Sequence, residues 1–171
     1  MTLMLRREVA LGNFVSLLLV LAVATTRAAS GPGEVGGQVQ WVDVALLNGR
    51  ILTAEELQGS AVVVQIWASW CPFCGAQNPH VQKLAEEYRG KGLVVLALSI
   101  DRTEQAARDY LARRGYAFNV AMHSPQADAW FGPRRTVPET YVIDRTGRIV
   151  FAQRGEMFPE DIAALGRYAA K

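Results

Sequence analysis

The sequence predicts an α/β fold, in which helices cover both faces of a mixed central β-sheet. Three observations carry this prediction. Apolar runs at residues 61–67 and 93–100 have the length and composition of strands buried on both faces. A segment with helical periodicity follows each run, and this alternation is typical of a helix-covered sheet. Short apolar runs at residues 140–143 and 148–151 flank a turn at 144–147, which indicates an antiparallel pair and therefore a mixed sheet.

The elements before the first long strand are short. Residues 40–46 and 50–52 are predicted to form a hairpin, because Asn48-Gly49 between them favours a two-residue primed turn. Thr53 is the expected N-cap of a helical turn. Glu56, three residues later, completes a capping box with it.

The later elements alternate. We expect a helix over residues 71–89, kinked at Pro79, after the first long strand. After the second, we expect a helix that is capped by Asp101 or Thr103 and ends at Gly115. The remaining predicted elements are a strand at 118–122, a helical turn at 125–131, the strands at 140–143 and 148–151, and a C-terminal helix from 159.

The N-terminus indicates export. Arg6 and Arg7 precede an apolar block at residues 14–24, and small residues follow it, which is typical of a secretory signal peptide over residues 1–28. The alternative is an uncleaved membrane anchor at residues 9–24, although a spanning helix needs about 20 apolar residues. Residues 29–38, with several glycines and a proline, are interpreted as a flexible lead, and residues 39–171 as one domain.

Charge excludes a nucleic-acid partner. The chain has 18 basic and 16 acidic residues, a net charge of +2. The first 28 residues hold three arginines and one glutamate, so the expected mature protein is neutral. Nucleic-acid binding would require a basic stripe on the folded domain.

The chemistry is concentrated in Trp70-Cys71-Pro72-Phe73-Cys74, which contains both cysteines of the chain. A strand before this motif and a helix after it put Cys71 at a helix N-terminus, where free backbone N–H groups and the helix dipole favour a thiolate. A structural disulfide is the first alternative, but so short a loop constrains the unfolded chain little. A metal site is the second; structural zinc needs four ligands, and only His80 and His123 could join the cysteines. We expect no metal.

These features resemble a known family, the thioredoxin-fold, extracytoplasmic disulfide oxidoreductases of the TlpA, ResA and CcmG kind. The resemblance covers roughly residues 47–155. It rests on residues 63–74 with Pro79 beyond them, on residues 92–101, and on residues 137–149, which begin Val-Pro-Glu-Thr-Tyr. It implies a thioredoxin-like fold and a cis bond between Val137 and Pro138, lying against the dithiol. The Val137 backbone would then pair with an extended client segment, as an added strand does.

Five further positions support the expected site. Trp70, Pro72 and Phe73 surround the cysteines, and we expect Trp70 and Phe73 to form a partly exposed apolar rim for a partner protein. Many family members carry Glu where this chain has Gln77; a carboxylate there would disfavour a nearby thiolate, whereas an amide does not. Glu139 matches the cytochrome c maturation subgroup, in which an acid here lies near the active site. The alternative for Glu139 is an edge acid that faces solvent.

The resemblance implies thiol–disulfide exchange, in which Cys71 attacks a client disulfide and Cys74 resolves the mixed disulfide. We expect a periplasmic reductase of client proteins, with apocytochrome c as one client class and a membrane thiol-electron donor that restores the dithiol. No cofactor is expected beyond the redox-active Cys71–Cys74 disulfide. Two alternatives stay open: a thiol oxidase or isomerase of the same fold, and a copper-binding chaperone that uses Cys71, Cys74 and His123.

Overall fold

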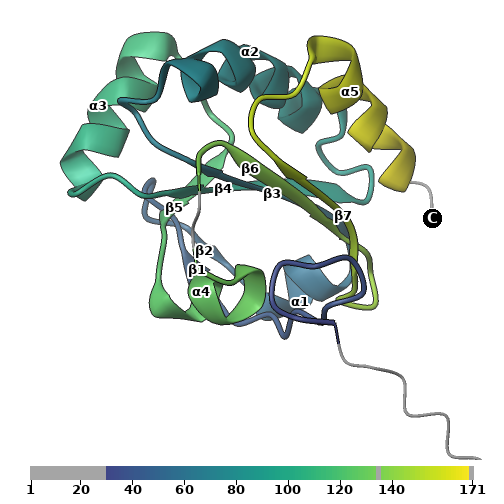
Figure 1. The fold of residues 1–171 in the computed structure, drawn as a ribbon. Coiled ribbons are helices and arrows are strands. Elements are labelled where there is room, and N and C mark those ends of the chain that lie inside the picture. The colour runs from purple at the N-terminus through teal and green to yellow at the C-terminus, as the bar shows by residue number, and fades with distance from the viewer. Residues whose placement is uncertain (1–29, 134–135, 170–171) are drawn as a thin grey trace, which may run out of the picture.

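The computed structural model describes residues 30–133 and 136–169. Its centre is a five-stranded sheet with the order β5-β4-β3-β6-β7 (Figure 1). The central strand β3 pairs in parallel with β4 and antiparallel with β6, so the sheet is mixed, as the sequence predicts. The strands are β3 (Ala61–Trp67), β4 (Leu93–Ser99), β5 (Asn119–Met122), β6 (Glu139–Ile143) and β7 (Ile149–Arg154).

Helices cover both faces of this sheet (Figure 1). One layer consists of α2 (Pro72–Glu87), α3 (Glu104–Arg114) and α5 (Pro159–Ala164), which a 3-10 helix, Leu165–Tyr168, continues. The opposite layer consists of α1 (Ala54–Gln58), α4 (Pro125–Phe131) and the two-stranded pair β1 (Val44–Ala45) and β2 (Ile51–Leu52).

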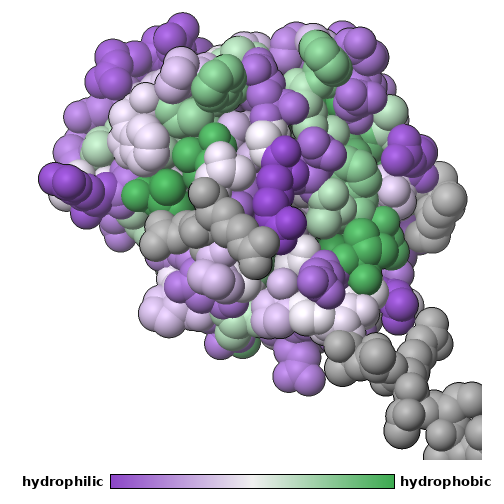
Figure 2. All heavy atoms as spheres, in the orientation of Figure 1, coloured by the Kyte–Doolittle hydropathy of each residue, from purple (hydrophilic) through white to green (hydrophobic). Residues whose placement is uncertain are grey.

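The pleat of β3 divides the core into two clusters. Val63 and Trp67 belong to the cluster that contains Leu84 of α2, and Val64 belongs to the cluster that contains Leu57 of α1. All seven residues of β3 are buried, as expected for a strand covered on both faces. On the face drawn in Figure 2, polar side chains cover most of the surface and apolar side chains gather in separate areas.

Helix ends follow the predicted signals. The capping box of Thr53 and Glu56 is present at α1. Gly115 ends α3 in the left-handed conformation, with φ +68°. Of the two proposed caps of α3, the structure selects Thr103, whose hydroxyl accepts a hydrogen bond from the Ala106 N–H. Asp101 has another role, described below.

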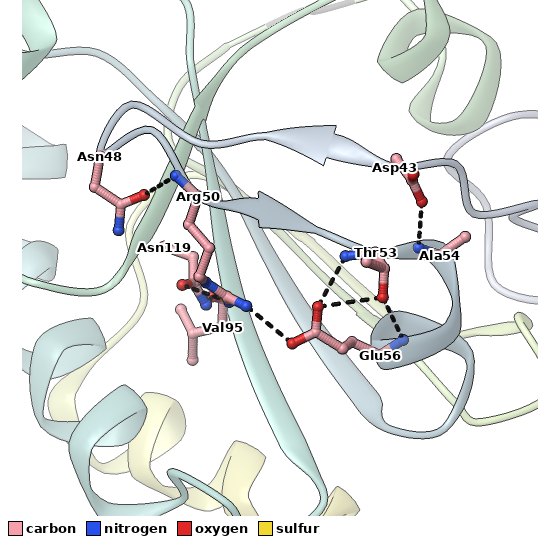
Figure 3. Close-up of polar contacts among 8 residues, drawn as sticks. All are labelled: Asp43, Asn48, Arg50, Thr53, Ala54, Glu56, Val95 and Asn119. Carbon is pink, nitrogen blue, oxygen red and sulfur yellow. Dashed lines mark hydrogen bonds and ion pairs between the residues drawn. The ribbon is translucent and has the colours of Figure 1, made fainter.

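The first hairpin differs from the prediction in its connection. The strands are only two residues long, and three residues, 47–49, connect Leu46 and Arg50, which share a backbone hydrogen bond. Only Gly49 has a positive φ, so Asn48 and Gly49 are not the two central residues of a primed turn. The Asn48 side chain instead accepts a hydrogen bond from the Arg50 N–H, and Arg50 reaches Glu56 and Asn119 (Figure 3).

The predicted flexible lead is also different in the structure. Between residues 30 and 38 the backbone bonds to the domain: Gly33 N–H donates to the Trp130 carbonyl, and Gly36 N–H to the Ile149 carbonyl. The Ile149 N–H returns a bond to the Gly37 carbonyl. The glycine-rich composition suggested freedom, but these long-range backbone bonds hold the segment against α4 and β7.

The predicted signal peptide or anchor, residues 1–28, lies outside the described residues. Within residues 30–133 and 136–169, no helix combines the length and the apolar character needed to cross a bilayer.

Candidate functional site

The cysteines lie where the carboxyl ends of the parallel strands β3 and β4 meet, the edge at which α/β sheets usually place their sites. The chain leaves β3 at Trp67, turns through Ala68 and Ser69, and enters α2 at Pro72. The segment that precedes β6 approaches the same point through Val137 and Pro138.

Cys71 is the N-cap of α2, and its sulfur is the capping atom. The Cys74 backbone N–H donates to Cys71 Sγ at 3.4 Å. The Cys71 thiol donates to the Val137 carbonyl oxygen at 3.5 Å. A thiolate at Cys71 would keep the first of these bonds and would lie against the positive end of the helix dipole, which stabilises negative charge.

Cys74 is in a different environment. Its side chain is fully buried, at 0 % exposure, whereas Cys71 keeps 5 %. Burial, followed by the hydrogen bond with Cys71 and the negative charge of Asp101, holds the pKa of the Cys74 thiol well above its ordinary value. The structure contains both cysteines as free thiols. The two sulfurs therefore differ: Cys71 Sγ lies at the helix N-terminus, and Cys74 lies behind it in a fully buried position with a raised pKa.

An open cleft leads to Cys71. Its described lining residues carry no ionisable group other than Cys71 itself, and they come from the motif, the end of β4 and the segment before β6: Trp70, Cys71, Pro72, Phe73, Ile100, Thr136 and Val137. Trp70 is 65 % exposed and Phe73 57 % exposed. This arrangement fits the expected apolar rim beside a reactive sulfur.

The bond between Val137 and Pro138 is cis, as the resemblance implies, and the contact between Cys71 and Val137 places it beside the dithiol. The Pro138 carbonyl accepts a hydrogen bond from the Gly155 N–H at 2.8 Å, which ties the segment to the end of β7.

Gln77 is buried, and its amide joins three elements. Its Nε2 donates to Thr140 Oγ1 of β6 at 3.2 Å, and its Oε1 accepts from the Met157 N–H, ahead of α5, at 2.9 Å. Neither hydrogen bond goes to a sulfur atom. The geometry gives Gln77 a part in holding α2 over the sheet.

Glu139 does not face solvent, so the alternative of an exposed edge acid is wrong. It is 2 % exposed. The Tyr141 hydroxyl donates to one of its oxygens at 2.7 Å, and the Thr136 N–H donates to the other at 3.4 Å. Burial and this contact raise the pKa of the Tyr141 hydroxyl well above its ordinary value. Glu139 thus secures the segment that carries Val137.

Sequence reasoning missed two buried polar groups beside the dithiol. The sequence indicates Asp101 only as a possible helix cap; in the structure its carboxylate accepts hydrogen bonds from Ser69 and Ser99. Gln65 of β3 donates to Asn78 of α2, and Asn78 donates to the Tyr110 hydroxyl of α3. A signal for Asp101 existed: it and Ser69 follow the ends of neighbouring parallel strands, whose ends meet in space.

Among the described residues, no group of three or more His, Cys, Asp or Glu side chains is placed to hold a metal ion. His123 lies with Asp128, at 3.6 Å between Nε2 and Oδ1, and is not part of such a group with the cysteines. His80, on α2, contributes to a different hollow, beside Phe158.

Comparison with known proteins gives consistent results. The sequence model of the Redoxin family matches residues 35–167. The chain is 26% identical over 129 residues to the thiol-disulfide oxidoreductase ResA of Bacillus thuringiensis, covering 75% of each chain. It is 30% identical over 130 residues to the thiol:disulfide interchange protein DsbE homolog of Paracoccus denitrificans, covering 74% of this chain and 70% of that one.

Solved structures show the same fold. A thioredoxin-family thiol:disulfide interchange protein from Chlorobium tepidum TLS superposes with a TM-score of 0.72 at 19% identity, over 80% of this chain and 97% of the other. A putative DsbE from Chlorobium tepidum superposes with a TM-score of 0.68 at 26% identity, over 80% and 96% of the two chains. The thioredoxin-like fold is thus confirmed.

Replacing Gln77 with Glu tests its structural role. The new carboxyl group would be buried, which disfavours its charged form and raises its pKa in the folded state. The unfolded chain ionises at the lower, ordinary pKa, so the free energy of unfolding should fall relative to the wild type as the pH rises from about 5 to 8. Chemical denaturation at several pH values measures this loss. Gln126→Glu, at an exposed site, is the control, and an equally flat profile for both variants would contradict the assignment.

Proposed function

We propose that this chain, which belongs to the Redoxin family, acts as a reductase of disulfides in client proteins outside the cytoplasm. The coarser activity is shown by its relatives: it is a thiol-disulfide oxidoreductase with a thioredoxin-like fold. The direction of electron flow, the client and the compartment are the parts proposed here.

The observation on which the exchange chemistry of the proposal rests is the asymmetry of the two thiols. Cys71 lies at the helix N-terminus beside an open cleft, and Cys74 lies fully buried behind it with a raised pKa. A dithiol built this way has one attacking sulfur and one that stays protonated until it is needed. A purely structural disulfide would require neither a sulfur beside an open cleft nor a second sulfur with a raised pKa.

The reaction follows from this arrangement. The Cys71 thiolate attacks one sulfur of a client disulfide; a bond forms between Cys71 and the client, and the client S–S bond breaks, releasing a thiolate that takes up a proton. Cys74 then loses its proton and attacks Cys71 Sγ. The Cys71–Cys74 disulfide forms and the second client thiolate leaves, so the client gains two electrons and the chain loses two.

Client docking is proposed at the cleft of Trp70, Pro72, Phe73 and Val137. An extended client segment would pair with the Val137 backbone as an added strand, while the exposed rings of Trp70 and Phe73 cover the residues that flank the client cysteines. We include apocytochrome c as one client class, on the match of Glu139 with the cytochrome c maturation subgroup. The oxidised chain would be restored by a membrane thiol-electron donor, and no other cofactor is required.

The first prediction concerns the two sulfurs. In the native host, Cys74→Ala should accumulate mixed disulfides with client proteins, because Cys71 can still attack but nothing resolves the product. Non-reducing gels with and without dithiothreitol measure these adducts. Cys71→Ala is the matched control and should trap nothing; equal trapping by the two variants would overturn the assignment of roles.

The second prediction separates reductase from oxidase or isomerase. Equilibration with glutathione at known ratios gives the reduction potential of the Cys71–Cys74 pair. We expect a reduction potential of about −270 mV, as for thioredoxin, whereas a potential of about −120 mV is typical of a strong thiol oxidant. A measured potential of about −120 mV would contradict the reductase proposal and support a thiol oxidase of the same fold.

The third prediction concerns location. Residues 1–28 have the pattern of a signal peptide. Among the described residues, hydrogen bonds from Gly31 onward hold residues 31–37 together and join them to the domain. N-terminal sequencing of protein from the native host should find a start near Ala29 in the extracytoplasmic fraction. An intact Met1 on protein in the membrane fraction would instead support an anchor at residues 9–24, and an intact Met1 in the cytoplasm would refute export.

A further inference from the structure

Asp101 lies immediately beyond β4, beside the turn that leads into the active-site helix. It is buried, at 6 % exposure. Its carboxylate accepts hydrogen bonds from the Ser69 N–H at 3.1 and 3.2 Å, from the Ser69 hydroxyl at 2.7 Å, and from the Ser99 hydroxyl at 2.7 Å. Hydrogen bonds to a charged acceptor are among the stronger ones in proteins, more so where water is excluded.

These bonds fix the segment that places Cys71. Ser69 stands two residues before Cys71, and the Cys71 N–H closes the turn on the Ala68 carbonyl at 3.3 Å. The Ile100 N–H bonds to the Trp67 carbonyl at 2.9 Å, so the two strand ends are already joined just before the turn begins. The carboxylate of Asp101 extends this link to Ser69, two residues beyond Trp67, and so joins the end of β4 to the segment that enters α2.

We propose that Asp101 is a positioning residue for the dithiol: by holding Ser69, it sets Cys71 at the N-terminus of α2 with its sulfur between the Cys74 N–H and the Val137 carbonyl. This inference rests on the proposed role of Cys71 as the attacking sulfur. Asp101 lies beside the turn and acts through Ser69, so it takes no part in bond making.

The negative charge of Asp101 has a second effect, which the test must separate from positioning. After burial and the contact with Cys71, this charge contributes to the raised pKa of Cys74. Removing the charge alone favours thiolates in the site and should speed reactions of the sulfurs. Removing the hydrogen bonds that hold Ser69 should slow the reaction of Cys71, because its sulfur leaves the helix N-terminus. The two effects have opposite signs.

The chain offers a matched control. Asp144, in the turn between β6 and β7, accepts hydrogen bonds from the Thr146 N–H at 2.8 Å, the Thr146 hydroxyl at 2.6 Å and the Arg148 N–H at 3.0 Å. It holds a turn with the same kinds of donors as Asp101, at the other end of β6 from the Val137–Pro138 segment. An effect of general loosening should therefore appear in both variants.

The experiment measures the second-order rate constant for alkylation of Cys71 by iodoacetamide in the reduced full-length protein near neutral pH. Mass spectrometry identifies the modified cysteine, and circular dichroism confirms the fold. Asp101→Ala should slow Cys71 by about tenfold, because small displacements of a reacting group have large rate effects. Asp101→Asn keeps an oxygen acceptor for the Ser69 N–H and should stay within about threefold of the wild type. Asp144→Ala should leave the rate unchanged.

Two results would overturn the proposal. An unchanged rate in Asp101→Ala would show that Ser69 needs no support, and a faster rate in both Asp101 variants would show that only the charge matters. If Asp101→Ala does not fold, Ser69→Ala decides, because it removes only the 2.7 Å hydroxyl bond. It should slow Cys71 by about threefold, and an unchanged rate would again reject positioning. Failure of the proposed role of Cys71 is distinguishable, since wild-type protein itself would then be alkylated at Cys74 rather than Cys71. Failure of the reductase direction alone would appear in the reduction potential and would leave the alkylation rates unaffected.

Discussion

The hydrogen bond from the Cys74 N–H to the Cys71 sulfur is the interaction around which the site is arranged. Helices are usually capped by the oxygen of a Ser, Thr, Asp or Asn side chain. Here the capping atom of α2 is the sulfur of Cys71, the thiol proposed to attack. Its charge state therefore alters the start of the helix: a thiolate is a stronger acceptor for the N–H than a thiol, and a disulfide sulfur is a weaker one. Chemistry at Cys71 and the local stability of α2 are coupled through one bond.

The surroundings explain how this cap stays in place. Beneath it, Gln65 of β3 and Tyr110 of α3 both bond to Asn78, so a chain of buried polar side chains links strand and two helices behind the cysteines. Gln77 adds links to β6 and to the segment before α5. Burying such groups is costly unless their hydrogen bonds are made, and among the described residues Gln65 Oε1 finds no partner. The bonds that are made are directional, so they specify one position of α2 where apolar packing alone would allow several.

Local patterns allowed most elements to be predicted. The run at β3, the capping box at Thr53 and the left-handed Gly115 depend on neighbours in sequence, and each is present in the structure. The predictions were wrong where contacts between segments that are distant in sequence determine the local structure. Leu47 bonds to the Val120 carbonyl, which helps fix the wider connection of the first hairpin.

The same distinction holds at the site. The order of residues 70–74 located the two cysteines and the helix that starts between them. It could not reveal that Asp101, about thirty residues later, accepts a hydrogen bond from Ser69. Side-chain hydrogen bonds between residues so far apart in sequence produce no hydrophobic periodicity that a single sequence could show. Nor could it show that Glu139 turns inward, since an acid at a strand end is more often exposed.

The docked segment at residues 30–38 and the first hairpin together have a consequence for self-association. β5 and β7 are the two outer strands of the sheet, and an open outer strand is a template on which another copy can polymerise. Gly36 and Gly37 occupy the backbone groups of Ile149 at the start of β7, and Val39 bonds to the Gly147 carbonyl in the turn just before it. Leu47 occupies the Val120 carbonyl on β5. A second copy of the chain therefore cannot pair with these backbone groups, and strand addition is blocked at the start of β7 and at this position of β5.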